Sequence, residues 1–475
     1  MYSLLLLASV AFLASLLLTP VVRDCFRKLG LVDLPSERKI HQHPIPRMGG
    51  VAIVLSYLTA YGVLLLLHVH GTDSAWVARA HIWELVPAAA VIFAVGLVDD
   101  LFGLKPWQKL AGQLVAAAIA FGAGVRVNSF GGHAFNPWFS LPLTVIWLLA
   151  CTNAVNLIDG IDGLAAGIGL FATCTTLLAA LLQGNVELAL ATVPLAGALL
   201  GFLRYNFNPA TIFLGDSGSL FVGFLLGCYG VLWSQKSATI LGMTAPLMAL
   251  AIPLLDTALA IVRRFIHNQP IFGADRGHIH HRLLDRGFTP RKVTLLLYAC
   301  CAAGAICSLC MMNSTASGVV IIVFCASAWI GIQHLGYVEF GVVGRMFIEG
   351  AFRRQISAQI AIQSFEQRID AASTTDDCWV VIREAAKGFG FESIRMQLCG
   401  ESFGEGEWRE HSAAWRVHLP VGGSDWVELA RAFDLNMHST AIACFAAAIR
   451  KALATKTFKR PVSNQQEQVA AAQGA

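Results

Sequence analysis

Charged side chains are scarce in this 475-residue chain. Asp, Glu, Lys and Arg make up 13% of it, whereas apolar residues reach 56%, and an ordinary soluble protein has about 25% charged residues. This composition excludes a soluble enzyme. The shortage is uneven, because residues 1–344 carry 34 charged side chains and the much shorter segment 345–475 carries 30. The sequence therefore predicts a membrane domain followed by a smaller soluble module.

Other absences narrow the choice further. The net charge is only +4 and the chain has no long basic run, which argues against a nucleic-acid partner. Most of the twelve cysteines lie inside apolar runs, where a thiol behaves as a small hydrophobic group, so we expect reduced cysteines and no disulfide framework. The apolar N-terminus lacks both a preceding positive region and a small-residue cleavage site, which predicts an uncleaved first membrane helix.

Apolar segments are the most abundant feature. A helix that spans a bilayer needs about 20 mostly apolar residues, and eleven segments qualify. They lie near residues 2–22, 49–68, 82–98, 109–125, 139–153, 161–182, 187–203, 218–234, 238–262, 294–312 and 317–336. The expected fold is an all-α polytopic membrane protein with about eleven transmembrane helices in residues 1–336.

Lys and Arg in the loops predict the orientation, because positive loops stay on the cytoplasmic side. The first loop carries six such residues and the ninth carries seven, against three in all the loops of the other side, namely Arg79, Arg126 and Lys236. This bias places the N-terminus outside and the C-terminal module in the cytoplasm. The expected location is the bacterial inner membrane.

The C-terminal segment alternates between helical and extended patterns. An amphipathic linker at 337–376 precedes a module at 377–460 with a helix at 377–388, extended runs at 393–398, 414–419 and 426–433, and a helix at 439–453. This order predicts a small cytoplasmic α/β domain similar to a GAF-type sensor domain, with an unidentified regulator. Residues 461–475 have no apolar face and are predicted to be disordered.

Four polar motifs interrupt the apolar chain. They read D-D-L-F-G-L from Asp99, N-A-V-N-L-I-D-G-I-D-G-L from Asn153, F-L-G-D-S-G-S-L from Phe213 and H-I-H-H-R-L from His278. Acidic groups near membrane depth are costly, so each demands a reason. The orientation derived from Lys and Arg alone places all four motifs on the cytoplasmic side of the membrane. This agreement predicts that the motifs form one shared site.

The acidic motifs offer oxygen ligands. Asn156, Asp159 and Asp162 recur every three residues, so a helical start places them on one face, and such oxygens suit Mg²⁺. Asp216 either caps the helix that follows it or binds a metal. Adjacent helical residues diverge by about 100°, so we expect one of Asp99 and Asp100 to act as a base and the other to orient a cation. The sequence leaves open which does which.

The histidine motif favours a polyanion. His278, His280, His281 and Arg282 lie in a loop with seven Lys and Arg residues. Zinc is the rival ligand, but no cysteine is near and H-x-H-H lacks the usual spacing. Arg282 is able to bind phosphate oxygens with a bidentate fork while an imidazole donates to the same group. The alternative is that the positive residues only keep this loop on the cytoplasmic side, and it applies best to Arg263 and Arg264.

These motifs, in this order, resemble the polyprenyl-phosphate N-acetylhexosamine-1-phosphate transferases, the family of WecA, TagO and MraY. The likeness covers about residues 1–335 and includes the early segment 38–50, R-K-I-H-Q-H-P-I-P-R-M-G-G. It implies transfer of a sugar 1-phosphate from a UDP-sugar to a membrane polyprenyl phosphate, with Mg²⁺ (or Mn²⁺) and release of UMP, at the start of cell-envelope polysaccharide synthesis.

The resemblance also implies roles for individual residues. Asp216 and Asn156 would hold the metal, and Asp99 would be the base toward the lipid phosphate. The acids that would line the site are Asp100, Asp159 and Asp162. The substrate-binding residues would be Lys39, His41, His278, His280, His281 and Arg282.

The final cytoplasmic loop indicates the donor. His278-Ile279-His280-His281-Arg282 is similar to the WecA and TagO branch, whereas the MraY branch has three consecutive histidines. The expected donor is UDP-GlcNAc, with UDP-GalNAc and the UDP-MurNAc-pentapeptide as alternatives. A homodimer is left open.

Two other classes compete with a transferase. A secondary transporter also carries acids within its membrane domain, but here the acids sit at span ends and the two halves do not repeat. A membrane-anchored sensor explains the C-terminal module and leaves the four motifs without a role.

Overall fold

The protein is described here by a computed structural model, which places residues 2–34, 43–66, 82–130, 133–235, 248–266, 269, 277–310, 317–335, 351–406, 414–432, 439–454 and 456. The chain forms two compact units, Met1–Tyr337 and Val338–Ala475. This division lies one residue from the predicted end of the membrane domain.

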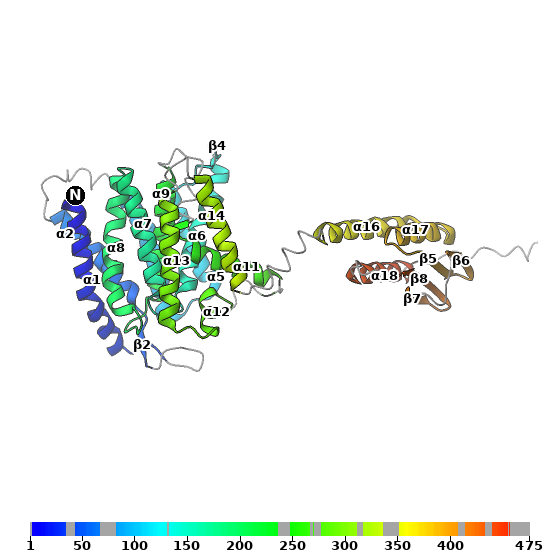
Figure 1. Ribbon diagram of the computed structural model, residues 1–475, viewed down its shortest axis with the longest axis horizontal. Helices are drawn as coiled ribbons and strands as arrows, with labels where there is room; N and C mark the ends of the chain where they lie inside the picture. Colours follow the sequence, from blue (N-terminus) through cyan, green and yellow to red (C-terminus); the bar gives the residue numbers. More distant parts are fainter. Residues whose placement is uncertain are drawn as a thin grey trace, which may run out of the picture. The chain divides into compact units, whose positions relative to one another are not determined.

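The first unit is a bundle of helices (Figure 1). In chain order its helices are α1 (Tyr2–Lys28), α2 (Gly49–Leu66), α4 (Ile82–Phe102), α5 (Pro106–Gly122), α6 (Pro137–Ile158), α7 (Leu164–Leu182), α8 (Val186–Asn206), α9 (Gly215–Gln235), α11 (Ala251–Ile266), α12 (Ile279–Asp285), α13 (Pro290–Cys310) and α14 (Ser317–His334). Two short antiparallel pairs join helices, β1 (Val32–Asp33) with β2 (Ile45–Pro46) and β3 (Ser129–Phe130) with β4 (His133–Ala134).

Each predicted span overlaps one of these helices, although part of the ninth span lies outside the described residues. Among the residues that the structure describes, eight helices are long and apolar enough to cross a membrane, namely α1, α2, α4, α6, α7, α8, α9 and α13. Helices α5 and α11 have 17 and 16 residues, and the apolar helix Gly318–His334 is also short. The structure therefore indicates a multi-pass membrane protein with eight candidate spans, fewer than the eleven predicted.

A tyrosine cluster inside the bundle satisfies backbone groups that the apolar surroundings would leave unpaired. Pro194 lies within α8 and has no N–H for the carbonyl oxygen of Leu190. The Tyr61 hydroxyl donates to that oxygen at 2.9 Å, and the Tyr57 hydroxyl lies 3.0 Å from that of Tyr229. The cluster joins α2, α8 and α9, which fixes α9 laterally within the bundle.

The second unit combines three helices with a four-stranded antiparallel sheet. Its elements are α16 (Ala351–Ala371), α17 (Thr375–Gly388), β5 (Ser393–Leu398), β6 (Glu401–Glu405), β7 (Ala414–Gly422), β8 (Asp425–Ala432) and α18 (Ser439–Ala454), with strand order β6-β5-β8-β7. The predicted strands and the two predicted helices of the module are present.

Strand β6 was not predicted, so the expected count of three strands is wrong. Its sequence E-S-F-G-E has one large apolar side chain. The strand lies at the edge of the sheet, next to β5, where few of its side chains need to be apolar. That side chain, Phe403, stacks on Trp379 of α17 with ring centroids 5.5 Å apart. An edge strand with a single apolar anchor gives too weak an alternation to be recognised from sequence.

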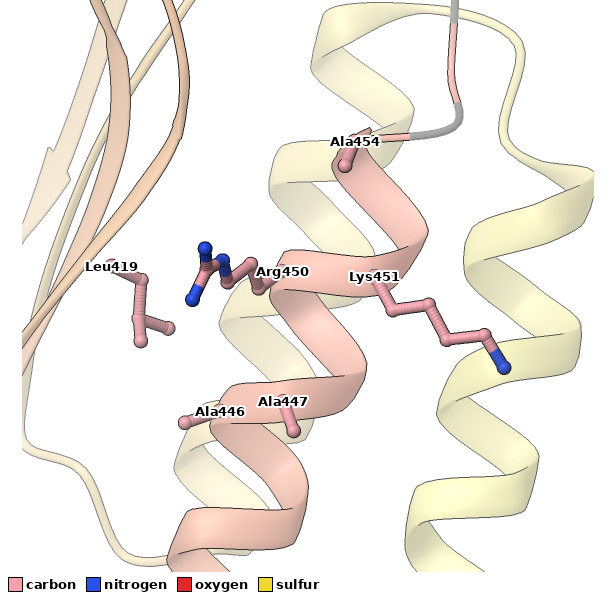
Figure 2. Close-up of a pocket in the computed structure, with 6 residues that line it drawn as sticks. All are labelled: Leu419, Ala446, Ala447, Arg450, Lys451 and Ala454. Atoms are coloured by element: carbon pink, nitrogen blue, oxygen red, sulfur yellow. The ribbon is translucent and has the colours of Figure 1, made fainter.

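The core of this unit draws on all three helices. Phe365 and Ile369 of α16, within the segment predicted as a linker, pack with Ile382, Met396 and Phe445. A separate pocket of about 480 Å³ lies between α18 and β7. Figure 2 shows the residues that line it, Leu419, Ala446, Ala447, Arg450, Lys451 and Ala454. Its lining consists of four apolar side chains and the two cations Arg450 and Lys451.

Candidate active site

The polar motifs meet where helices of the first unit end or begin. Asp99 and Asp100 lie in the last turn of α4 and Asn156 in the last turn of α6, whereas Asp216 lies in the first turn of α9. Figure 1 shows that α12, which carries the histidine motif, and β2 lie at the end of the bundle opposite to the start of α1. Segments far apart in the sequence therefore supply one end of the bundle with its polar groups.

Asp100 caps the start of α9. Its Oδ1 accepts the backbone N–H of Asp216 at 2.8 Å, and its Oδ2 accepts the N–H of Ser217 at 2.9 Å. The first N–H groups of a helix have no partner within the helix, and a carboxylate there is also favoured by the helix dipole. Both oxygens of Asp100 are thus engaged in holding the N-terminus of α9 against the C-terminal end of α4.

Asp99 faces a different partner. Its Oδ2 lies 2.6 Å from Nζ of Lys109, near the start of α5, and its Oδ1 accepts the N–H of Leu104 at 2.6 Å. The same ammonium group of Lys109 contacts Oδ2 of Asp216. Asp216 also accepts a hydrogen bond from Nδ2 of Asn156 at 3.0 Å. We call Asp99, Lys109, Asp216 and Asn156 the carboxylate cluster.

Close backbone contacts fix the position of this cluster. A Cβ atom at Gly96 of α4 would lie 2.6 Å from Cα of Ser217 and closer still to the carbonyl oxygen of Asp216. On the other side, a Cβ at Gly50 of α2 would lie 2.6 Å from Cα of Gly218. The first turn of α9 is therefore held between α2 and α4 at a spacing that only glycine permits.

Asp159 and Asp162 follow α6 but have different surroundings. Asp159 is half-buried, and desolvation together with the charges of Asp216 and Asp100 raises its pKa well above the usual range. Asp162 accepts hydrogen bonds at 3.0 Å from Nδ2 of Asn208 and from the N–H of Ala210. The structure thus brings Asp159 toward the carboxylate cluster and uses Asp162 to hold the connection between α8 and α9.

The histidine motif lies beside Asp159. A Cβ at Gly160 would lie 2.8 Å from Nε2 of His280, so this turn and α12 are in direct contact. His280 is 2% exposed, and both of its ring nitrogens are buried with no hydrogen-bond partner among the described residues. Burial, reinforced by the charge of His281, lowers the pKa of His280 to about 3. Buried polar atoms are normally paired, so these two nitrogens are open to a water molecule or a ligand.

Two arginines lie at the start of this motif. Nη1 of Arg263 donates to the carbonyl oxygen of Gly277 at 3.0 Å, and Nε of Arg282 donates to the same oxygen at 3.4 Å. His278 lies next to Gly277, and its Nδ1 is 3.0 Å from Oδ2 of Asp256 in α11. The structure therefore places His278, His280, His281 and Arg282 close together, with Arg263 beside them.

Sequence reasoning missed Lys109 and Asp256. Lys109 stands at the edge of a predicted span, where a positive residue reads as a topology signal. Asp256 stands inside the predicted ninth span. An acidic residue at that depth is itself the signal of a functional site. Two predicted substrate-binding residues, Lys39 and His41, lie outside the described residues.

The carboxylate cluster fits a magnesium ion that shares its ligands with a substrate. No group of three or more His, Cys, Asp or Glu side chains in the described part of the chain is arranged to hold a metal by itself. Mg²⁺ commonly takes only one or two protein carboxylates and completes its shell with phosphate oxygens and water. Asp216 and Asp99, which share one ammonium group, match this smaller set. Asn156 now turns its amide nitrogen toward Asp216, and it would match the set with its amide turned over so that the oxygen faces the metal.

Comparison with known proteins gives a family match. The model of glycosyl transferase family 4 matches residues 82–234. A probable undecaprenyl-phosphate N-acetylglucosaminyl 1-phosphate transferase of Bacillus subtilis is 37% identical over 298 residues, which cover 61% of this chain and 80% of the relative. A decaprenyl-phosphate N-acetylglucosaminephosphotransferase of Mycobacterium tuberculosis is 35% identical, over 59% and 75% of the two chains. An Escherichia coli undecaprenyl-phosphate alpha-N-acetylglucosaminyl 1-phosphate transferase is 28% identical, over 60% and 78%.

Proposed function

Because the chain belongs to glycosyl transferase family 4, we propose that it transfers N-acetylglucosamine 1-phosphate from UDP-GlcNAc to undecaprenyl phosphate or another polyprenyl phosphate. The observation that carries this proposal is the carboxylate cluster beside the buried histidines, at one end of a bundle of apolar helices. A lipid acceptor explains why a polar site is built on helices of this composition.

The chemistry joins two polyanions. An oxygen of the lipid phosphate attacks the β-phosphorus of UDP-GlcNAc, the bond from that phosphorus to the oxygen of the α-phosphate breaks, and UMP leaves with the electron pair. Bound Mg²⁺ (or Mn²⁺), on Asp216 and Asn156, would neutralise phosphate charge and stabilise the leaving group. The positive charges of Lys109 and Arg282 would stabilise the negative charge that remains on the phosphate groups.

We assign the base to Asp99, whose Oδ1 accepts one backbone N–H and whose Oδ2 faces the ammonium group of Lys109. Both oxygens of Asp100 accept backbone N–H groups of α9, so Asp100 positions Asp216. Asp99 faces Lys109, and Lys109 also contacts Asp216. In our proposal Asp99 takes the proton from a singly ionised lipid phosphate before attack. Asp159 lines the site, and Asp162 supports it through the connection between α8 and α9.

Several finer assignments belong to the same proposal. We place all eleven predicted segments across the bacterial inner membrane, with the N-terminus outside and both the active site and the C-terminal unit in the cytoplasm, on the evidence of the Lys and Arg bias. The C-terminal unit is proposed to be a sensor similar to a GAF domain. The product would start a cell-envelope polysaccharide.

A single assay tests the proposed reaction. Purified protein is incubated with radiolabelled UDP-GlcNAc, a polyprenyl phosphate and MgCl2, and the labelled lipid and UMP are measured. We expect equal amounts of both products, and none without lipid or with EDTA. Formation of neither product by folded protein would contradict the proposal and favour a transporter or a sensor.

The donor is a prediction of its own. At equal concentrations of UDP-GlcNAc, UDP-GalNAc and UDP-MurNAc-pentapeptide, we expect the highest initial rate with UDP-GlcNAc, because the α12 region offers imidazole nitrogens and the guanidinium groups of Arg282 and Arg263 to a sugar-linked diphosphate. UDP-GalNAc should follow, since it differs by one epimeric hydroxyl group. A faster rate with the pentapeptide nucleotide would overturn this assignment.

Removal of the C-terminal unit should leave catalysis largely intact. Residues 338–475 form a compact unit with its own apolar core, so a chain that ends at residue 344 retains the bundle and its site. We expect a specific transfer rate within about twofold to threefold of the full chain, because separate units contribute independently. Loss of transfer in a truncated protein with an unchanged unfolding temperature would make the C-terminal unit part of the catalytic machinery.

A further inference from the structure

Asp256 lies in the middle of α11 and is 1% exposed. Both of its carboxylate oxygens are directed at the histidine motif. Oδ2 is 3.0 Å from Nδ1 of His278, and Oδ1 accepts the backbone N–H of Ile279 at 2.8 Å. A buried carboxylate is expensive unless its partners repay the desolvation, and here the partners that the structure shows belong to the neighbouring segment, not to α11.

The contact with Asp256 determines how His278 presents its ring. A carboxylate group accepts hydrogen bonds, so this contact favours the tautomer of His278 that carries its proton on Nδ1. Nε2 is at the other edge of the imidazole and is directed away from the Asp256 carboxylate. The ring lies parallel to that of His280, with an interplanar angle of 2° and centroids 5.6 Å apart. Asp256 therefore sets both the proton position and the orientation of His278 beside the unpaired nitrogens of His280.

We propose that Asp256 is a positioning residue for the transfer reaction, which holds His278 so that its Nε2 donates to the diphosphate of the UDP-sugar. This inference rests on the proposed function. A phosphate oxygen accepts hydrogen bonds, so a bound His278 donates from Nε2 as well as from Nδ1 and carries a positive charge. The negative carboxylate of Asp256 stabilises that positive charge, as an acid beside a functional histidine commonly does.

A purely structural role is the alternative, in which Asp256 only anchors the backbone of α12 through Ile279. The two roles differ in how substitutions combine. If Asp256 acts through His278, its replacement has no further effect once Nε2 is gone. If Asp256 only holds α12, the losses at the two positions multiply, because independent effects on free energy add.

The experiment measures UDP affinity by calorimetry and kcat/KM for UDP-GlcNAc on the full chain in detergent. The variants are Asp256→Asn, His278→Asn and the double variant. In the His278→Asn protein, the amide nitrogen takes the place of Nδ1 as the donor to Asp256. The substitution leaves no group in the place of Nε2. Thr257→Val is the matched control, because Thr257 is the next residue of α11, is buried and bonds only to the carbonyl oxygen of Pro253 in its own helix.

Each single variant should weaken both UDP affinity and kcat/KM by about 10-fold to 100-fold, the double variant should lose no more than the worse single variant, and Thr257→Val should match the unsubstituted protein. Multiplied losses in the double variant would overturn the positioning role. If Asp256→Asn fails to fold, Asp256→Glu takes its place in the same set of single and double variants, because it keeps the carboxylate but shifts it relative to His278. Undiminished UDP affinity in the His278→Asn protein would by itself remove Nε2 from the site. A protein that binds UDP with this pattern but transfers no sugar phosphate contradicts the proposed function and not this inference.

Discussion

Replacement of Asp216 by asparagine should reduce UMP release by at least about 10²-fold to 10³-fold, while the protein still inserts and folds. The substitution keeps the size of the side chain and its backbone contacts with Asp100, but removes the charge that Lys109 and the predicted metal share. Loss of one electrostatic group aimed at developing charge costs this much in other enzymes. The measurement is the rate of UMP release as a function of MgCl2 concentration.

The control for this substitution is Asp285→Asn. Asp285 is an exposed acid at the end of α12, so its replacement removes one negative charge from the same unit without touching the carboxylate cluster. We expect its rate to equal that of the unsubstituted protein. Near-normal turnover of the Asp216→Asn protein at low Mg²⁺ would rule out Asp216 as a metal ligand, and an equal loss in both variants would point to net charge instead.

Lys109 makes the Asp216 prediction sharper than the sequence alone allowed. Two ionised carboxylates near one ammonium group carry a net charge of −1. Removal of one partner of an isolated, partly buried pair would leave an uncompensated charge. In the Asp216→Asn protein, however, Lys109 retains Asp99 at 2.6 Å. The substitution therefore weakens catalysis without leaving a cation unpaired, which is why the unfolding temperature should change little.

The sequence predicted the helices well because their signal is local. A run of about 20 apolar residues has few alternatives in a membrane, and every predicted segment overlaps a helix. The motifs were found for a related reason, since Asp99, Asp159 and Asp216 stand out against an apolar background. The family resemblance inferred from these motifs is confirmed by the matching family and relatives.

Relations between distant residues could not be predicted in the same way. The choice between Asp99 and Asp100 depends on which carboxylate meets the N-terminus of α9, more than 100 positions later in the chain. The partnership of Asp256 with His278 depends on how α11 packs beside α12. Neither contact leaves a periodicity or a spacing in the sequence, because the fold and not the local chain sets those distances.

The Gly96→Ala substitution should separate the shape of the site from its chemistry. A Cβ at position 96 would lie 2.6 Å from Cα of Ser217, and both atoms belong to helix backbones that cannot turn aside as a side chain would. The first turn of α9 must move away from α4, which stretches the bonds from Asp100 and displaces Asp216. A displacement of about 1 Å at a reacting group costs about 10²-fold in rate, and overpacking adds about 1–3 kcal/mol of destabilisation.

Gly62→Ala provides the matched comparison, since Gly62 lies within α2 and a Cβ there meets no described atom within 4 Å. Transfer rate and unfolding temperature are measured for both variants in detergent. We expect Gly96→Ala to lose about 10²-fold in kcat with a lowered unfolding temperature, and Gly62→Ala to match the unsubstituted protein. Equal activity in the two variants would mean that the contact between α4 and α9 does not position Asp216. It would also contradict the role of Asp100 as the residue that holds α9 in place.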